Sequence, residues 1–168
     1  MKNKVIKVNH EISPIYNKDS KILILGSIPS PKSRENGFYY AHSQNKFWKV
    51  LSNIFHYDIP NNNEMKKEFL LKNNIALWDV IASCEIKGAS DTSIKNVQVN
   101  DINMIINNSK VNAIFTTGKK ANDLYMKYCY PNTKIESIYL PSTSPANCAN
   151  YSFEDLVEEY RIILDYLK

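Results

Sequence analysis

The stretch KILILG, residues 21–26, decides the fold of this chain. A short apolar run that ends in glycine is typical of a strand buried on both faces. Three further segments have the length and the β-branched content of such strands, namely Ile75–Val80, Val111–Thr117 and Ile135–Leu140. We therefore expect one sheet built from these four segments.

Amphipathic segments alternate with the predicted strands. Apolar residues recur at helical spacing in Gln44–Phe55, Glu64–Asn73, Asp101–Asn107, Lys119–Tyr128 and Phe153–Leu167. Ser152 is the expected N-cap of the last helix, with Glu154 and Asp155 in its first turn. Strands that are apolar on both faces and alternate with helices predict an α/β fold: a three-layer α/β/α domain with a central, mainly parallel four-stranded sheet.

Length and composition indicate one compact domain. The 168 residues, 43% of them hydrophobic, suit a single domain spanning 1–168, with residues 1–12 loosely ordered. The longest strongly apolar run, Ile22–Leu25, is far shorter than the roughly 20 residues that cross a bilayer, and no segment resembles a signal peptide. We expect a monomer with no membrane partner that is cytoplasmic, and nucleoid-associated if the source is a prokaryote.

Charge and cysteine content exclude some kinds of site. A net charge of +4 is compatible with a phosphate-rich partner without requiring one. Cys84, Cys129 and Cys148 form no CxxC pair, which argues against a disulfide framework and against a zinc or iron–sulfur site. Buried reduced thiols are the expected state.

Ligands of parallel sheets bind beyond the carboxyl ends of the strands, which directs attention to three loops. The first, GSIPSPKSRENG (residues 26–37), contains two prolines that hold the chain extended and the hydroxyls of Ser27, Ser30 and Ser33. It has neither the GK[ST] of a Walker A loop nor the GxGxxG of a dinucleotide fingerprint. A stiff connection between strand and helix is an equally good interpretation.

The next segment, GFYYAHSQNKFW (residues 37–48), combines aromatic rings with hydrogen-bonding groups. Phe47 and Trp48 fit the buried stripe of the following helix and are expected in the core. Tyr39 and Tyr40 precede the helix at the ligand edge of the sheet, where a ring can stack on a planar ligand such as a nucleobase.

Two polar residues of this segment have open roles. Asn45 carries a neutral amide that can orient a water, read a base edge or make a hydrogen bond at the helix terminus. His42 has no histidine or acidic partner at metal-ligand spacing, so a supporting or capping role is expected.

The loops after the second and fourth predicted strands are also polar. LPSTSPAN (residues 140–147) is rigid and exposes small hydroxyls, which suits contact with a phosphodiester backbone as well as a plain turn. DVIASCEIKGASDTSIKN (residues 79–96) contains Asp79 and Asp91, whose roles stay open. No GxSxG motif is present and no histidine lies downstream of His56, so a serine hydrolase is set aside.

Taken together, these motifs resemble the uracil-DNA glycosylase superfamily, and within it the hypoxanthine-DNA glycosylases and the related mismatch-specific enzymes. The resemblance is carried by GSIPS, GFYYAHSQNKFWKVL, ALWDVIASCEIKGASDTSIKN and LPSTSPAN, and covers about residues 20 to 167. Ile28 stands where the mismatch-specific enzymes have the asparagine that positions the attacking water. The resemblance to the deoxyinosine branch therefore assigns that duty to Asn45 and base stacking to Tyr40. Leu140 stands where other branches place a histidine for uracil release, which favours hypoxanthine.

The resemblance implies a monofunctional glycosylase that hydrolyses the N-glycosidic bond of a deaminated base flipped out of double-stranded DNA, without a cofactor or metal. Besides Asn45 as the catalytic residue, it implies base-binding residues Gly26, Ser27, Ile28, Pro29, Tyr40 and His42, and DNA-binding residues Ser30, Ser142, Thr143, Ser144, Pro145 and Asn147. A mismatch-specific uracil or thymine glycosylase, and a non-catalytic nucleic-acid-binding domain of the same fold, remain alternatives.

Overall fold

The computed structural model describes residues 4–88, 90–147 and 150–168. Its central sheet is parallel and has four strands in the order β3-β2-β6-β7. The strands are β2 (Ile22–Gly26), β3 (Ile75–Asp79), β6 (Ala113–Thr117) and β7 (Ser137–Leu140). Each lies within a segment predicted to be a strand.

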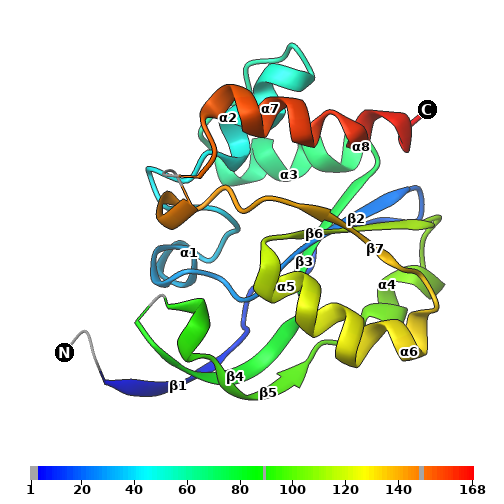
Figure 1. Ribbon diagram of the computed structural model, residues 1–168. Helices are drawn as coiled ribbons and strands as arrows, with labels where there is room; N and C mark the ends of the chain where they lie inside the picture. Colours follow the sequence, from blue (N-terminus) through cyan, green and yellow to red (C-terminus); the bar gives the residue numbers. More distant parts are fainter. Residues whose placement is uncertain (1–3, 89, 148–149) are drawn as a thin grey trace.

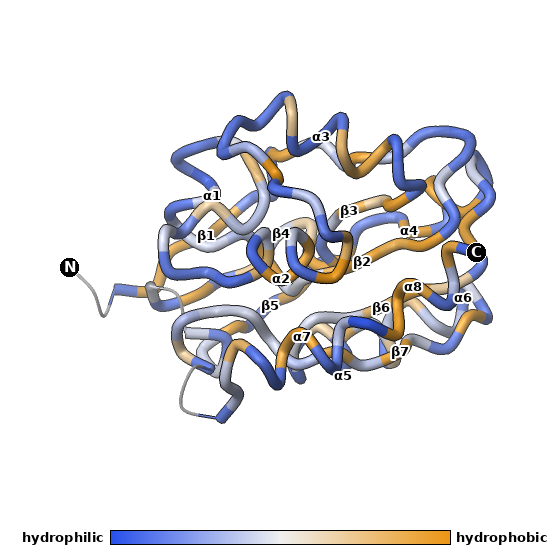
Figure 2. Tube along the Cα trace, turned by 90° about the horizontal axis from the view of Figure 1, so that it is seen from above, coloured by the Kyte–Doolittle hydropathy of each residue, from blue (hydrophilic) through white to orange (hydrophobic). Residues whose placement is uncertain are grey.

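Helices cover both faces of this sheet (Figure 1). One layer holds α2 (Phe47–Ile54), α3 (Asn63–Lys72), α7 (Phe153–Tyr160) and α8 (Ile162–Asp165). The other holds α4 (Ile102–Asn107), α5 (Lys119–Leu124) and α6 (Tyr130–Thr133), with the π-helical turn η2 (Tyr125–Cys129) between the last two. α2 and α7 contact each other and lie next to one another in the view from above (Figure 2). The predicted three-layer α/β/α fold is confirmed.

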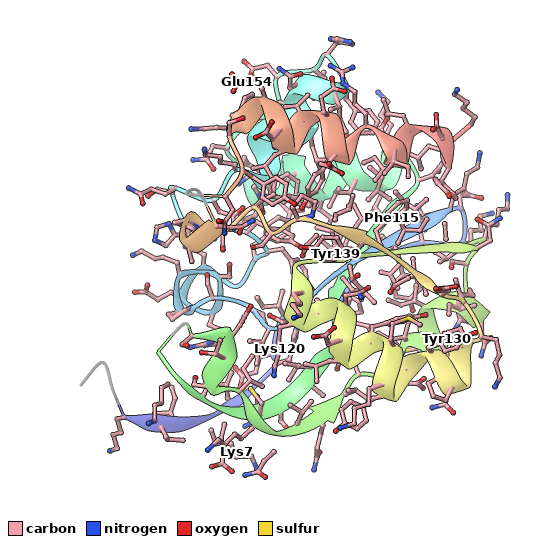
Figure 3. All side chains as sticks on the ribbon, in the orientation of Figure 1. Lys7, Phe115, Lys120, Tyr130, Tyr139 and Glu154 are labelled. Atoms are coloured by element: carbon pink, nitrogen blue, oxygen red, sulfur yellow. The ribbon has the colours of Figure 1, made fainter. Side chains whose placement is uncertain are left out.

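Local sequence explains where the helix at the carboxyl end begins. The side chain of Ser152 accepts a hydrogen bond from the amide of Asp155, and the side chain of Asp155 accepts one from the amide of Ser152. This capping box satisfies two backbone donors at the start of α7, beside Glu154 (Figure 3). The predicted N-cap is therefore confirmed.

A second sheet was not predicted. β1 (Val5–Asn9), β4 (Ile81–Lys87) and β5 (Lys95–Val99) form an antiparallel sheet in the order β1-β4-β5, with the 3₁₀ turn η1 (Asp91–Ser93) between β4 and β5. The expectation that residues 1–12 are loosely ordered is wrong for Val5–Asn9, and the segment after Asp79 is mostly strand. In β1 only Val8 is buried, so backbone pairing with β4, and not an apolar pattern, holds this strand.

The loop after β2 contains a short helix that was also not predicted, α1 (Pro31–Asn36). Ser30 is its N-cap, Pro31 occupies the first turn, and Gly37 ends it with a left-handed φ of 67°. These are the residue types that favour the start and the end of a helix.

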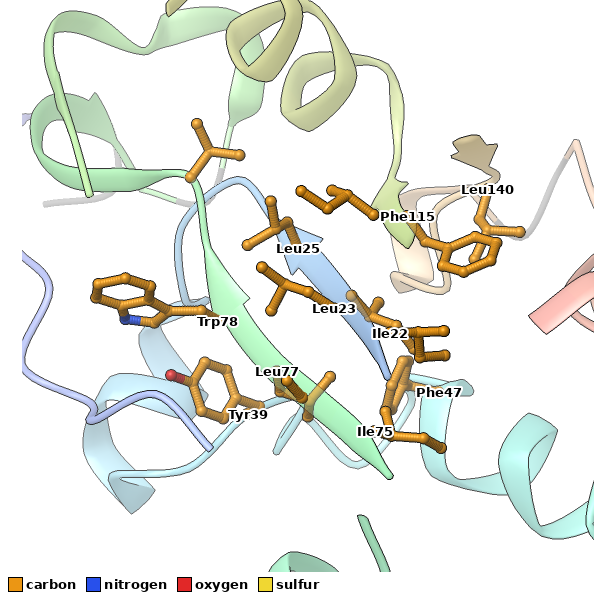
Figure 4. Packing of buried hydrophobic residues seen from close by; sticks show 14 of the residues in the cluster. Ile22, Leu23, Leu25, Tyr39, Phe47, Ile75, Leu77, Trp78, Phe115 and Leu140 are labelled. Atoms are coloured by element: carbon orange, nitrogen blue, oxygen red, sulfur yellow. The ribbon is translucent and has the colours of Figure 1, made fainter. Parts of the chain in front are cut away.

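The core lies on both faces of the parallel sheet. Ile22, Leu23, Ile24 and Leu25 are fully buried, and Phe47 packs into the same cluster (Figure 4). The predicted core positions Phe47 and Trp48 are confirmed, at 0% and 8% exposure. Cys84 and Cys129 are buried free thiols, while Cys148 lies outside the described residues.

Two further features follow from the described parts of the chain. Among the helices seen there, none has the length and apolar character needed to span a bilayer. Within residues 4–88, 90–147 and 150–168, no three His, Cys, Asp or Glu side chains gather as candidate metal ligands.

The strand order marks where a ligand would bind. The chain passes from β2 to β3 on one side and later returns to β6 on the other side of β2. Such a reversal opens a crevice at the carboxyl end of the central strand. The loops after β2 and β7 and the turn between β4 and β5 gather at this end, at the left of Figure 1.

Candidate active site

A cavity of about 940 Å³ lies at the carboxyl ends of the parallel strands. Residues at or just after the end of each strand line it: Gly26, Asp79, Thr117 and Ser142. The segment from Tyr39 to Asn45 and the turn around Asp91 form further parts of its wall. Segments distant in sequence therefore meet around one cavity.

Tyr40 is held rigidly at the cavity wall. Its ring stacks on Phe47 with the centroids 3.8 Å apart and the planes 11° apart. Its hydroxyl lies 3.3 Å from Thr117 Oγ1, which in turn donates to the Leu25 carbonyl oxygen. Burial, and secondarily the nearby Asp79 carboxylate, raises the pKa of the Tyr40 hydroxyl, so the phenol is neutral at physiological pH.

The backbone of Tyr40 is strained. Its φ of 53° lies in the left-handed region, which costs a non-glycine residue about 1 kcal/mol. Such strain persists where the surrounding structure holds the residue, often at functional sites. Tyr39 differs, because it is 2% exposed and its hydroxyl donates to the Ser13 carbonyl oxygen.

Asn45 is fixed by its side-chain carbonyl. Oδ1 accepts hydrogen bonds from the amide of Phe47 at 2.9 Å and from the hydroxyl of Thr143 at 2.8 Å. The helix-terminus bond that the sequence left open is therefore present. Because the backbone amide of Phe47 can only donate, the side-chain atom that it contacts must be the oxygen Oδ1 and not the nitrogen. The side-chain nitrogen, Nδ2, has no hydrogen-bond partner among the described residues. Asn45 lines the cavity, so the structure makes a hydrogen-bond donor available there.

The last loop is joined to the Asn45 segment. Thr143 is 2% exposed, its hydroxyl donates to Asn45, and its carbonyl oxygen accepts from the amide of Lys46 at 3.1 Å. Tyr160 of α7 donates to the Pro141 carbonyl oxygen at 2.6 Å. The Thr143 hydroxyl, predicted to contact DNA, is thus already committed to Asn45.

The loop after β2 is tied down at several points. Ser30 caps α1, the Arg34 guanidinium donates to the Pro29 carbonyl oxygen at 2.7 Å, and the Ser33 hydroxyl accepts from the amide of Ala41 at 3.1 Å. Ser27 donates to Asp91 Oδ1 at 3.2 Å across the cavity rim.

His42 lies half-buried at the same wall. Its Nδ1 accepts a hydrogen bond from the amide of Gln44 at 3.0 Å, which places the proton of a neutral ring on Nε2. The His42 ring therefore caps the turn that contains it, which agrees with the capping role expected from the sequence.

Sequence reasoning missed one buried pair. His10 Nε2 lies 2.8 Å from Asp79 Oδ2, and the side chains are 2% and 5% exposed. His10 follows β1, and its amide donates to the Ala82 carbonyl oxygen, so pairing of β1 with β4 brings it beside the end of β3. The acidic Asp79 at the end of the apolar strand IALWD stands out in the sequence as a candidate site residue. Nothing in the sequence around His10 indicates such a role.

The structure brings nearly all predicted site residues to the cavity. Asn45 and every predicted base-binding residue line it: Gly26, Ser27, Ile28, Pro29, Tyr40 and His42. So do the predicted DNA-binding residues Ser30, Ser142, Thr143, Ser144 and Pro145, while Asn147 donates to the Ser142 carbonyl oxygen behind them. Their roles toward a ligand stay predictions.

Comparison with known protein families gives one match that spans most of the chain. Residues 13–168 match the family model of the uracil DNA glycosylase superfamily. A protein named hypoxanthine DNA glycosylase from Methanosarcina barkeri (strain Fusaro / DSM 804) is 32% identical over 112 residues, which cover 66% of this chain and 71% of that protein. Another of that name, from Methanosarcina acetivorans, is 30% identical over 135 residues, covering 79% and 84% of the two chains.

A solved structure shares the whole architecture. The solution NMR structure of a candidate uracil DNA glycosylase from Methanosarcina acetivorans superimposes with a TM-score of 0.79 at 26% identity. The match covers 95% of this chain and 99% of the other.

Proposed function

Because the chain belongs to the uracil DNA glycosylase superfamily, we propose that it is a monofunctional DNA glycosylase of base excision repair that removes hypoxanthine from deoxyinosine. The names of the two Methanosarcina relatives support this base. Ile28 and Leu140 support it too, because neither side chain can position a water or stabilise a departing uracil by a hydrogen bond.

One observation carries the proposal: Tyr40 and Asn45 meet the loops after β2 and β7 around one cavity. A planar ring, a fixed amide and a concave space are what a flipped nucleotide needs. Flipping costs a few kcal/mol, least at a poorly paired base, and stacking on Tyr40 recovers part of this free energy.

In the proposed reaction Asn45 acts through its Nδ2 group. Nδ2 donates a hydrogen bond to the oxygen of a water beneath C1′ and so fixes its position. The water oxygen then bonds to C1′ as the C1′–N bond breaks, and the bonding electron pair leaves with the base. The proton that the water loses passes through solvent to the departing base, so that the products are the neutral base and an abasic sugar. Fixed dipoles stabilise the separated charges, with backbone groups of Gly26–Ser30 on the base edge.

The last loop is proposed to bind the DNA backbone. Ser142 and Ser144 lie beside the cavity on a segment that Asn147 and Tyr160 hold in place. Hydroxyls and amides of this kind position a duplex without reading its sequence. Residues 141–147 also supply a wedge for the space left by the flipped nucleotide.

A panel of duplexes, each with a single inosine, uracil, xanthine or mismatched thymine, tests this function. Incubation is followed by alkaline cleavage of abasic sites, with an Asn45→Ala preparation as the control for contaminating glycosylases. We expect the fastest release from inosine. Faster release from uracil or thymine would support the mismatch-specific alternative, and binding without any abasic product would contradict both enzyme readings.

A further inference from the structure

A second cavity, of about 720 Å³, adjoins the candidate active site. Tyr40, His42 and Asn45 line both spaces. The rest of the wall of the second cavity comes from α2, from the loop that follows α2 and from Lys66 of α3, and these helices belong to one layer (Figure 1). None of the residues that line only this second cavity has a role in the reaction proposed above.

Lys66 is a buried cation in the wall of the second cavity. The residue is 7% exposed, although lysine is almost never buried without an ion-pair partner. Its Nζ donates to Asn61 Oδ1 at 3.0 Å and lies 5.1 Å from the centroid of the Trp48 ring. Among the residues that the structure describes, Lys66 forms no ion pair. Its charge is therefore buried without a counter-charge.

The hydrogen-bonding capacity of Lys66 is also only partly used. An ammonium group has three N–H donors, and one of them is taken up by Asn61. Burial disfavours the charged form and lowers the pKa of Lys66. An anion in the cavity would supply the missing counter-charge and would accept the remaining donors.

The other groups on the wall of the second cavity are compatible with an oxyanion. Lys49 adds a second cation, which is exposed, while Asp58 is the one carboxylate among the lining residues and is exposed to solvent. Ser52 Oγ accepts from the amide of Ile59 at 3.2 Å, which leaves the hydroxyl hydrogen for another acceptor. Two cations thus face one solvated carboxylate, and the buried one of the two has no acidic partner.

We propose that the second cavity is a phosphate-binding subsite, in which Lys66 pairs with a backbone phosphate of the DNA strand that carries the flipped nucleotide. This inference rests on the proposed function. Phosphates follow one another along a strand about every 3.4 Å of helix axis. A strand whose nucleotide enters the first cavity therefore passes its neighbouring phosphates close to the wall that the two cavities share. The same oxyanion occurs in inorganic phosphate, and the experiments below distinguish the two sources.

The salt dependence of DNA affinity tests Lys66. Fluorescence anisotropy is measured over a range of salt with a duplex that contains 2′-fluoro-deoxyinosine, whose glycosidic bond resists hydrolysis. Each phosphate that a cation neutralises contributes about 0.9 to the slope of log affinity against log salt. Lys66→Met should therefore lower the slope by about 0.9 and weaken binding about tenfold, while Lys66→Arg should keep the slope. An unchanged slope in Lys66→Met would overturn the inference.

Lys67→Met, at the exposed neighbour of Lys66 on α3, is the matched control. It removes the same charge from the chain and should keep the wild-type slope. A fall in slope as large as that of Lys66→Met would assign the effect to overall charge and would contradict a specific subsite. Thermal unfolding of the three variants verifies that each is folded.

Duplexes that carry a single methylphosphonate, which removes the charge of one phosphate, locate the contact. In the wild-type protein one position on the lesion strand should lower affinity about tenfold. The same position should have no further effect in Lys66→Met, because the partner of that phosphate is already absent. Equal losses in both proteins at every position would contradict the pairing of Lys66 with the DNA backbone.

NMR titration with inorganic phosphate, against chloride at equal ionic strength, tests the subsite without DNA. The indole N–H of Trp48 is the reporter, because Lys66 lies over this ring. It should shift in the wild type and not in Lys66→Met. A shift without a coupled methylphosphonate position would overturn the DNA backbone as the ligand, and the absence of both would overturn the subsite. A chain that releases no base from any duplex contradicts the proposed function, while this titration still decides whether Lys66 binds phosphate.

Discussion

The two sheets contribute to the cavity in different ways. The parallel sheet and its connections present side chains to the ligand space, among them Asn45, Tyr40 and Asp79. The antiparallel sheet and its turn supply partners: His10 holds Asp79, and Asp91 accepts from Ser27. The parallel sheet, called the presenting side below, carries the side chains proposed to act on the ligand, and the antiparallel sheet, called the holding side, supplies contacts that hold them. Variants on the two sides should therefore differ in the size and kind of their effect on excision.

The largest effect is expected at Asn45, on the presenting side. Asn45→Ala removes the donor proposed to fix the water, and excision should fall by about 10²-fold or more. Affinity for duplex DNA should stay close to wild type, as measured by fluorescence anisotropy. Asn107→Ala, at an exposed asparagine of α4, is the control.

Asn45→Asp separates the two functions of this side chain. A carboxylate can still accept from Phe47 and Thr143 but has no Nδ2 donor, so the helix start is kept. We expect the same loss of excision with a smaller change in thermal unfolding than in Asn45→Ala. Activity at the wild-type level would show that the acceptor matters and would contradict the proposed donor.

The next effect is expected at Gly26, where the two sides meet. A methyl group would lie 2.5 Å from Asp79 Oδ1, so Gly26→Ala must displace the carboxylate from its place beside His10. Because Asp79 lines the cavity, its displacement changes the shape of the space proposed for the base. Excision of hypoxanthine should fall by about tenfold or more, the scale of a lost charge-assisted hydrogen bond.

Gly37→Ala is the matched control for Gly26→Ala. Nothing lies within 4 Å of a Cβ at Gly37, but its φ of 67° makes alanine strained there. This variant should lose about 1 kcal/mol of unfolding free energy with little change in excision. Unfolding by urea and single-turnover excision distinguish the two outcomes. Unchanged excision in Gly26→Ala would show that Asp79 is free to move aside without loss.

The presenting side was largely predictable from the sequence. Strands such as KILILG are apolar on both faces, and their carboxyl ends must meet at one edge of a parallel sheet. That rule places the loops after Gly26 and Leu140 together without any knowledge of side-chain contacts. The link between Thr143 and Asn45 was not predictable, because it depends on how two loops dock.

The holding side was not predictable for a physical reason. β1 exposes most of its side chains, so the apolar periodicity that reveals a buried strand is missing from VIKVN. Its register on β4 is set by backbone pairing, and only this pairing brings His10 to Asp79. A histidine beside an unrecognised strand therefore had no context.

A smaller effect than at Asn45 is expected at Tyr40. Tyr40→Ala removes the ring proposed to stack on the flipped base, and stacking on an aromatic side chain is worth about 1–3 kcal/mol per base. Excision at limiting duplex should fall about tenfold, and 2-aminopurine fluorescence beside the lesion should report less flipping. Tyr40→Phe should retain most activity, and Tyr128→Ala, at an exposed tyrosine, is the control. Loss in Tyr40→Phe equal to that in Tyr40→Ala would assign the effect to the hydroxyl.

The smallest effect is expected at Ser27, whose contact with Asp91 is exposed to solvent. Water can replace the hydroxyl there, so Ser27→Ala should lower excision by no more than about threefold, in contrast to the buried contact of His10. A double-mutant cycle with Asp91→Ala measures the coupling free energy of the pair, which should be below about 1 kcal/mol. A tenfold loss in Ser27→Ala, or a larger coupling, would mean that the antiparallel sheet contributes to the chemistry itself. The distinction between the two sheets would then not apply to Ser27 and Asp91 at the cavity rim, and would apply only to the buried pair of His10 and Asp79.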